Sequence, residues 1–183
     1  MLSGETAVGA YPVEAVETMA RIACSAEGEM FGYEKWFDDG RKSNGEKDDT
    51  DAIAEAVATI AHDRKAKAII CSTSSGATAR TLSKFKPRCP ILAATSNPRA
   101  EREMAVSWGV CPLTTGYPAD TDEMIENAVN AAVAAGHVHA GDLVVITAGT
   151  PVGVPGSTNL IKVHKVGEPL KQPAAPKPAE VGV

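Results

Sequence analysis

Residues 146–159 read Ile-Thr-Ala-Gly-Thr-Pro-Val-Gly-Val-Pro-Gly-Ser-Thr-Asn, and no other stretch of the chain is as informative. An apolar strand runs directly into a loop that holds three glycines and two prolines, and a second strand follows the loop. Such a loop can bring backbone N–H groups close to a ligand, because glycine has no side chain in the way. A plain turn would need fewer residues. We therefore predict a binding loop that includes Gly153, Pro155 and Gly156.

The chain before this loop alternates strand and helix patterns from residue 51 onward. Apolar runs predict strands at 68–71, 91–95, 110–113, 143–147 and 159–166. Helical spacing predicts helices near 51–61, 76–85, 97–109 and 120–136, with Asn97 and either Asp120 or Thr121 as N-caps. Pro112 indicates that the strand at 110–113 is very short or lies at a sheet edge.

This alternation predicts an α/β fold, a three-layer open and mostly parallel sheet with helices on both faces. The last strand lies too close to its predecessor for a helical crossover, so we expect it to run antiparallel.

Four segments are predicted along the chain. Residues 1–40 contain a long helix that opens at Pro12, and residues 41–50 are a polar linker. Residues 51–167 form the α/β domain. Residues 168–183 are rich in proline and leave little to bury, so we expect a disordered tail.

Composition excludes several classes of protein. The net charge of −5 and the absence of a long basic cluster argue against a nucleic-acid or anionic-membrane partner. With 44% hydrophobic residues, mean hydropathy of −0.10, no membrane-length apolar run and no signal-peptide pattern, we expect a cytoplasmic globular protein. The four cysteines lack a C-x-x-C pair, which disfavours a zinc site and a disulfide framework, and we expect buried, reduced thiols.

A second candidate binding segment lies between the strand at 68–71 and the next helix. Its residues are Thr73, Ser74, Ser75, Gly76, Ala77 and Thr78. Free N–H groups at a helix N-terminus attract an anion, and the hydroxyls add donors, so the segment fits a phosphate cradle. A helix-capping turn rich in Ser and Thr fits the same residues, and the local sequence does not decide between the two. The lysine of a Walker loop and the three-glycine dinucleotide fingerprint are both missing.

Both loops would emerge at the carboxyl ends of their strands if 68–72 and 143–147 are parallel, and open α/β sheets bind ligands there. We therefore expect residues 72–78 and 148–157 to converge on one crevice. No catalytic set accompanies them: the four histidines lie apart from any recognisable acid or nucleophile, and Asp48, Asp49 and Asp51 are expected to be a solvated charge run. No metal site is expected in this chain.

Five segments of the chain closely resemble pyruvate kinase, and the resemblance covers about residues 1–166. They are residues 1–7, 11–16, 95–98, 141–147 and 158–159. The resemblance implies that the first 40 residues are the remnant of the catalytic barrel and contain its final helix. It also implies that the α/β domain carries an allosteric site for phosphorylated effectors and helps to form a homotetramer.

The resemblance further implies that the chain has no catalytic residue of its own. In the family, the ligands of phosphoenolpyruvate, ADP, Mg²⁺ and K⁺ lie in the earlier barrel strands. The reaction of glycolysis that converts phosphoenolpyruvate and ADP to pyruvate and ATP would therefore need the remainder of pyruvate kinase as a partner, and this chain alone would be inactive.

The resemblance also indicates the class of effector. Residues 73–78 match the family's first phosphate pocket, but the chain has no arginine after Arg102 to complete a second pocket. Without a bidentate clamp, a sugar monophosphate or AMP is favoured over a bisphosphate. The alternative is a stand-alone module that binds phosphorylated metabolites, in which the helix at 12–30 would be covered. A nucleotide-binding oxidoreductase domain is disfavoured by the missing glycine fingerprint.

Overall fold

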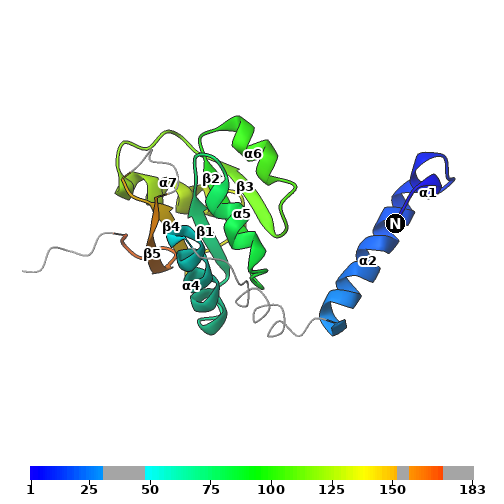
Figure 1. Cartoon of the computed structure of the whole chain (residues 1–183), viewed down its shortest axis with the longest axis horizontal. Helices are drawn as coiled ribbons and strands as arrows, with labels where there is room; N and C mark the ends of the chain where they lie inside the picture. Colours follow the sequence, from blue (N-terminus) through cyan, green and yellow to red (C-terminus); the bar gives the residue numbers. More distant parts are fainter. Residues whose placement is uncertain (31–47, 152–156, 171–183) are drawn as a thin grey trace, which may run out of the picture. The chain divides into compact units, whose positions relative to one another are not determined.

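The computed structural model describes residues 1–30, 48–151 and 157–170, and the chain divides into two compact units, Met1–Ser43 and Asn44–Val183. The first unit holds α1 (Gly4–Ala7) and α2 (Pro12–Met30) (Figure 1). Pro12 opens α2, as predicted, because proline suits the first helical position. Within this unit the α2 side chains Val13, Val16 and Ile22 are 64%, 53% and 61% exposed, so α2 has an uncovered apolar surface.

The second unit is built around one five-stranded sheet with the order β3-β2-β1-β4-β5. The strands are β1 (Ala68–Ser72), β2 (Ile91–Thr95), β3 (Val110–Thr114), β4 (Leu143–Gly149) and β5 (Thr158–Lys165). The first four are mutually parallel, and β5 pairs antiparallel with β4. The strand with the internal proline, β3, lies at an edge, where a missing N–H is tolerated.

Helices cover both faces of the sheet. They are α4 (Asp49–Asp63), α5 (Ala77–Lys84), α6 (Pro98–Met104) and α7 (Thr121–Ala134). α4 packs against α5 and, together with α5, against the sheet, whereas α7 packs on the opposite face (Figure 1). The topology explains why α5 and α7 lie on opposite faces of the sheet. Crossovers between parallel strands are right-handed, so the direction of a crossover along the sheet decides the face on which its helix lies. The crossovers through α5 and α6 run toward β3, whereas the crossover through α7 runs in the opposite direction, toward β4. The predicted three-layer, mostly parallel α/β fold is confirmed.

The two central strands β1 and β2 are buried on both faces of the sheet. Every residue of β1 and of β2 is buried. One face of these strands, which includes Ile70 and Leu92, packs against Ile125 and Val129 of α7. Burial raises the pKa of the Cys71 thiol in β1 to about 12, so this thiol stays protonated. The expectation of buried thiols is confirmed for Cys71, but Cys89 and Cys111 are half-buried and Cys24 is exposed on α2.

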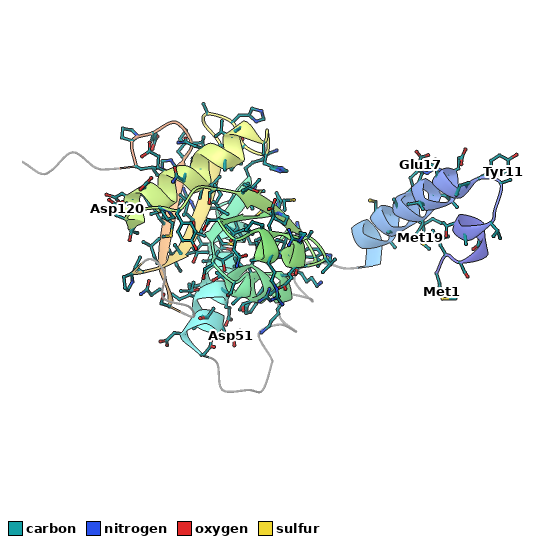
Figure 2. The ribbon with its side chains drawn as sticks, turned by 90° about the horizontal axis from the view of Figure 1, so that it is seen from above. Met1, Tyr11, Glu17, Met19, Asp51 and Asp120 are labelled. Carbon is teal, nitrogen blue, oxygen red and sulfur yellow. The ribbon has the colours of Figure 1, made fainter. Side chains whose placement is uncertain are left out.

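Short polar side chains start three helices of this unit. Asp48 caps α4, Asn97 caps α6 and Asp120 caps α7, each by accepting from a backbone N–H group. Figure 2 shows Asp51 in the first turn of α4 and Asp120 at the start of α7.

The caps at Asn97 and Asp120 agree with the sequence analysis, whereas the cap at Asp48 was not predicted and two boundaries differ. α4 starts at Asp49, so the acidic run at 48–51 begins a helix. α6 ends at Met104 instead of continuing toward Gly109, because Val106, at 90% exposed, finds nothing to pack against.

The last described residues pack against the core of their own unit, the second one. Leu170 is half-buried against the core on the α7 face, and Lys162 Nζ donates to its carbonyl. Most of the predicted tail, residues 171–183, and most of the predicted linker, residues 41–47, lie outside the described residues.

Candidate functional site

A crevice of about 360 Å³ lies at the carboxyl ends of the parallel strands. Residues that follow β1, β2 and β3 line it, and two α7 side chains and the ends of the β4–β5 connection complete it. The chain continues from β1 to β2 on one side of β1, whereas β4 lies on the other side of β1. The strand order therefore changes direction between β1 and β4, and the crevice lies at this point. Open α/β sheets bind ligands at that point because adjacent loops leave the sheet in opposite directions.

The predicted segment between β1 and α5 forms one wall of the crevice. Thr73, Ser74, Ser75, Ala77 and Thr78 line it, and the buried Gly76 is the N-cap of α5. Gly76 has a φ of 78°, and a Cβ there would lie 2.7 Å from Arg80 Nη1 and 2.7 Å from Met104 Cγ. Glycine is therefore required both by backbone conformation and by space.

The backbone contacts at the start of α5 involve one hydroxyl of this segment. No side chain caps α5. Thr73 Oγ1 instead accepts from the Gly76 N–H at 3.0 Å, which tightens the turn. The backbone N–H groups of Ser74, Ser75 and Ala77 have no acceptor among the residues that the structure describes. Unpaired N–H groups at a helix start are the donors that an anion requires.

Ser72 adds an unpaired polar atom to the same wall. It ends β1, is only 9% exposed and contributes to the crevice lining. Its Oγ is buried and has no hydrogen-bond partner among the described residues. Because a buried hydroxyl is normally paired, this atom suits a polar group of a bound molecule or an ordered water. The sequence analysis placed Ser72 in the converging range 72–78 but did not list it among the predicted binding residues.

The base of the β4–β5 loop is held closed by specific contacts. A Cβ on Gly149 would lie 2.6 Å from Ser157 Oγ, so glycine allows the two ends of the loop to approach. Asn159 Oδ1 accepts from the Thr150 N–H and from its hydroxyl, and Asn159 Nδ2 donates to the Thr150 carbonyl at 2.7 Å. The predicted binding residues Gly153, Pro155 and Gly156 lie outside the described residues.

The far end of the crevice is uncharged. Tyr117 and Pro118 follow β3, and the half-buried Met124 and Asn127 come from α7. Among the described lining residues, none is Asp, Glu, Lys, Arg, His or Cys. A lining of this kind suits ligand binding, and its described residues supply no general acid or base near neutral pH. In the described part of the chain, no group of three or more His, Cys, Asp or Glu side chains could hold a metal ion.

Two residues that bond to carbonyl groups of the cradle were not assigned to the site from sequence, and one of them, Asn97, itself lines the crevice. Arg80 Nη2 donates to the Ser75 carbonyl at 3.0 Å, and Asn97 Nδ2 donates to the Ser74 carbonyl at 3.2 Å. The position of Arg80 one helical turn after Gly76 could have indicated its contact. Nothing local indicates the contact of Asn97, because it depends on β1 and β2 being neighbours.

Comparison with known proteins decides the family. Residues 51–164 match the family model described as pyruvate kinase, alpha/beta domain. The chain is 47% identical over 166 residues to the pyruvate kinase of Clostridium acetobutylicum, an alignment that covers 91% of this chain and 35% of the relative. It is 45% identical over 170 residues to pyruvate kinases of Staphylococcus epidermidis and Staphylococcus aureus, covering 93% of this chain and 29% of each relative.

The chain belongs to the pyruvate kinase family.

The whole described crevice lies inside the family's α/β domain, since its lining runs from Ser72 to Thr158. The predicted family is confirmed, and with it the identification of this chain with the C-terminal domain of pyruvate kinase. The chain spans about a third of the length of these pyruvate kinases. No helix among the described residues is long and apolar enough to span a membrane.

Proposed function

We propose that this chain is the regulatory C-terminal part of a pyruvate kinase and that its crevice binds a phosphorylated metabolite. One observation carries the proposal. At the start of α5 the N–H groups of Ser74, Ser75 and Ala77 find no acceptor among the described residues. These donors and the positive end of the helix dipole fit a phosphate group.

The effector we propose is a sugar monophosphate or AMP. A bisphosphate would need cationic partners at both ends of the ligand, and the described end opposite the cradle offers Tyr117, Met124 and Asn127. The Arg80 guanidinium lies on the cradle side, where it is bonded to the Ser75 carbonyl. Gly153, Pro155 and Gly156 remain our proposed residues for the opposite side of the ligand.

Phosphate transfer from phosphoenolpyruvate to ADP is the activity we propose for the complete protein, with Mg²⁺ and K⁺, in glycolysis and in the cytoplasm. The crevice described above has no group for that chemistry, so we expect this chain alone to be inactive. The exposed apolar side chains of α2 support packing against the rest of pyruvate kinase. We also propose that the domain contributes to a homo-oligomer, a tetramer in the complete protein.

Calorimetric titration of the chain with matched sugar phosphates tests the binding site. Glucose 6-phosphate, fructose 6-phosphate and AMP should be compared with fructose 1,6-bisphosphate. We expect at least one monophosphate to bind, and fructose 1,6-bisphosphate to bind no more tightly than fructose 6-phosphate. Absence of binding by every compound would contradict the effector site, and a bisphosphate preference of about tenfold, or 1.4 kcal/mol, would contradict the assignment of the ligand.

A coupled assay tests the expected inactivity. The purified chain, supplied with phosphoenolpyruvate, ADP, Mg²⁺ and K⁺, should form no pyruvate above the level of a mock purification. Pyruvate formation that copurifies with the chain would show that it carries catalytic groups that we have not identified.

A further inference from the structure

The side chain of Asn97 makes contacts in two directions. Its Oδ1 accepts from the N–H groups of Arg99 and Ala100 at 3.0 and 3.4 Å, which caps α6. Its Nδ2 donates to the Ser74 carbonyl at 3.2 Å. The cap requires an acceptor, so the amide has to present its oxygen to α6 and its nitrogen to the cradle. One side chain thus connects α6 with the loop after β1.

This contact fixes the direction of the next N–H group. A trans peptide is planar, and its N–H points opposite to its C=O. Because the Ser74 carbonyl faces Asn97, the Ser75 N–H of the same peptide points away from Asn97. Ser74 and Ser75 line the crevice together with Gly149 and Ser157, the described ends of the β4–β5 connection.

The following peptide is held in a similar way. Its carbonyl, from Ser75, accepts from Arg80, and its N–H, from Gly76, donates to Thr73 Oγ1. Both ends of the Ser75–Gly76 peptide are therefore occupied. In the Ser74–Ser75 peptide only the carbonyl is held, and the N–H remains available to a ligand.

We propose that Asn97 is a positioning residue for the effector site, an inference that rests on the proposed binding of a phosphorylated ligand. By holding the Ser74 carbonyl, Asn97 keeps the Ser75 N–H directed at the phosphate. If this peptide flipped, it would present a carbonyl oxygen to an anion. The loop would then bind phosphate only in the fraction of molecules with the competent orientation, which weakens the apparent affinity.

Two substitutions separate this role from helix capping. Asn97→Ser keeps a neutral N-cap but is too short to bond the Ser74 carbonyl as well, whereas Asn97→Ala loses both contacts. Loss of one such hydrogen bond should raise the apparent Kd for glucose 6-phosphate and for inorganic phosphate about threefold to tenfold in both variants. The melting temperature should fall further in Asn97→Ala than in Asn97→Ser, because only alanine also removes the cap of α6.

The affinities decide between the possible roles of Asn97. If Asn97→Ser bound both probes as tightly as the unsubstituted chain, the positioning role would be overturned. If the unsubstituted chain bound neither probe, the proposed effector site would fail, and this role would fail with it.

Nuclear magnetic resonance of the ligand-free chain gives a readout that a direct contact between Asn97 and the ligand would not change. We expect the Ser74 carbonyl ¹³C shift and the Ser75 amide shifts to move in Asn97→Ser before any ligand is added. Weaker binding without such changes would show that Asn97 acts on the ligand itself, and would overturn the positioning role.

Discussion

Thr78 and Thr158 share a hydrogen bond of 2.8 Å between their hydroxyl groups, although 80 residues separate them in the chain. Both side chains are buried. Thr78 lies in the first turn of α5 and Thr158 is the first residue of β5. The bond therefore joins the cradle to the start of β5, and both residues line the crevice.

Replacing one of these threonines should destabilise the domain more than replacing both. Thr78→Val or Thr158→Val leaves a buried hydroxyl without its partner, which costs about 1–3 kcal/mol. In the double variant neither hydroxyl remains, so the cost should be well below the sum. Urea unfolding of the four proteins in a double-mutant cycle measures this coupling. Strictly additive changes in the free energy of unfolding would show that the hydrogen bond is not formed.

Gly76→Ala should lower both the stability and the affinity for glucose 6-phosphate. A non-glycine residue at positive φ costs about 1–2 kcal/mol, and the new Cβ would also press on Arg80 and Met104. Gly109→Ala is the matched control, because Gly109 has a φ of 69° but no atom within 4 Å of the new Cβ. The free energy of unfolding should fall further in Gly76→Ala than in Gly109→Ala. An equal loss of unfolding free energy in the two variants would show that Arg80 and Met104 make room for the new Cβ without destabilising the domain.

Ala77→Glu should weaken phosphate binding without lowering stability. Ala77 is the first residue of α5 and lines the crevice. A carboxylate there interacts favourably with the positive end of the helix dipole but repels a bound anion. Ala77→Gln is the neutral control of similar size. At low salt we expect inorganic phosphate to bind about tenfold more weakly to Ala77→Glu than to Ala77→Gln. This difference in affinity should become smaller at higher salt, because salt screens the charges. Similar affinities for the two variants would place the phosphate elsewhere.

His164 should make the domain less stable in mild acid. Burial, with Lys162 nearby, lowers the pKa of His164 below its usual 6.5, although Glu168 acts in the opposite direction. The unfolded chain then binds the proton more tightly than the folded chain. The contribution of neutral His164 to stability is present above pH 6.5 and is lost as the pH falls from 6.5 through the folded-state pKa.

Unfolding free energies at pH 7.5 and pH 5.5 check this expectation, with His164→Gln as the control. The free energy of unfolding should fall less between pH 7.5 and pH 5.5 in His164→Gln than in the unsubstituted chain, because glutamine does not titrate. An equal drop in both proteins would assign the acid sensitivity to other groups.

Much of the fold could be predicted because its signals are local. The apolar runs at 68–71, 91–95 and 143–147 are strands buried on both faces, and the short link before β5 leaves no room for a crossover. Asn97 and Asp120 could be recognised as caps because a helix N-terminus lacks partners for its first N–H groups. The end of α6 could not be predicted, since a helical pattern alone does not tell whether Val106 finds a neighbour.

The sequence by itself determined the α/β layering, the two loops at the strand ends and the family resemblance, because these depend on the order of residues along the chain. Only the tertiary structure decided which side chains support the cradle. Asn97 reaches Ser74 because β2 lies beside β1, and Thr158 reaches Thr78 because β4, also beside β1, brings β5 to the crevice. Such contacts join residues far apart in sequence, so they exist only after the strands have taken their places in the sheet.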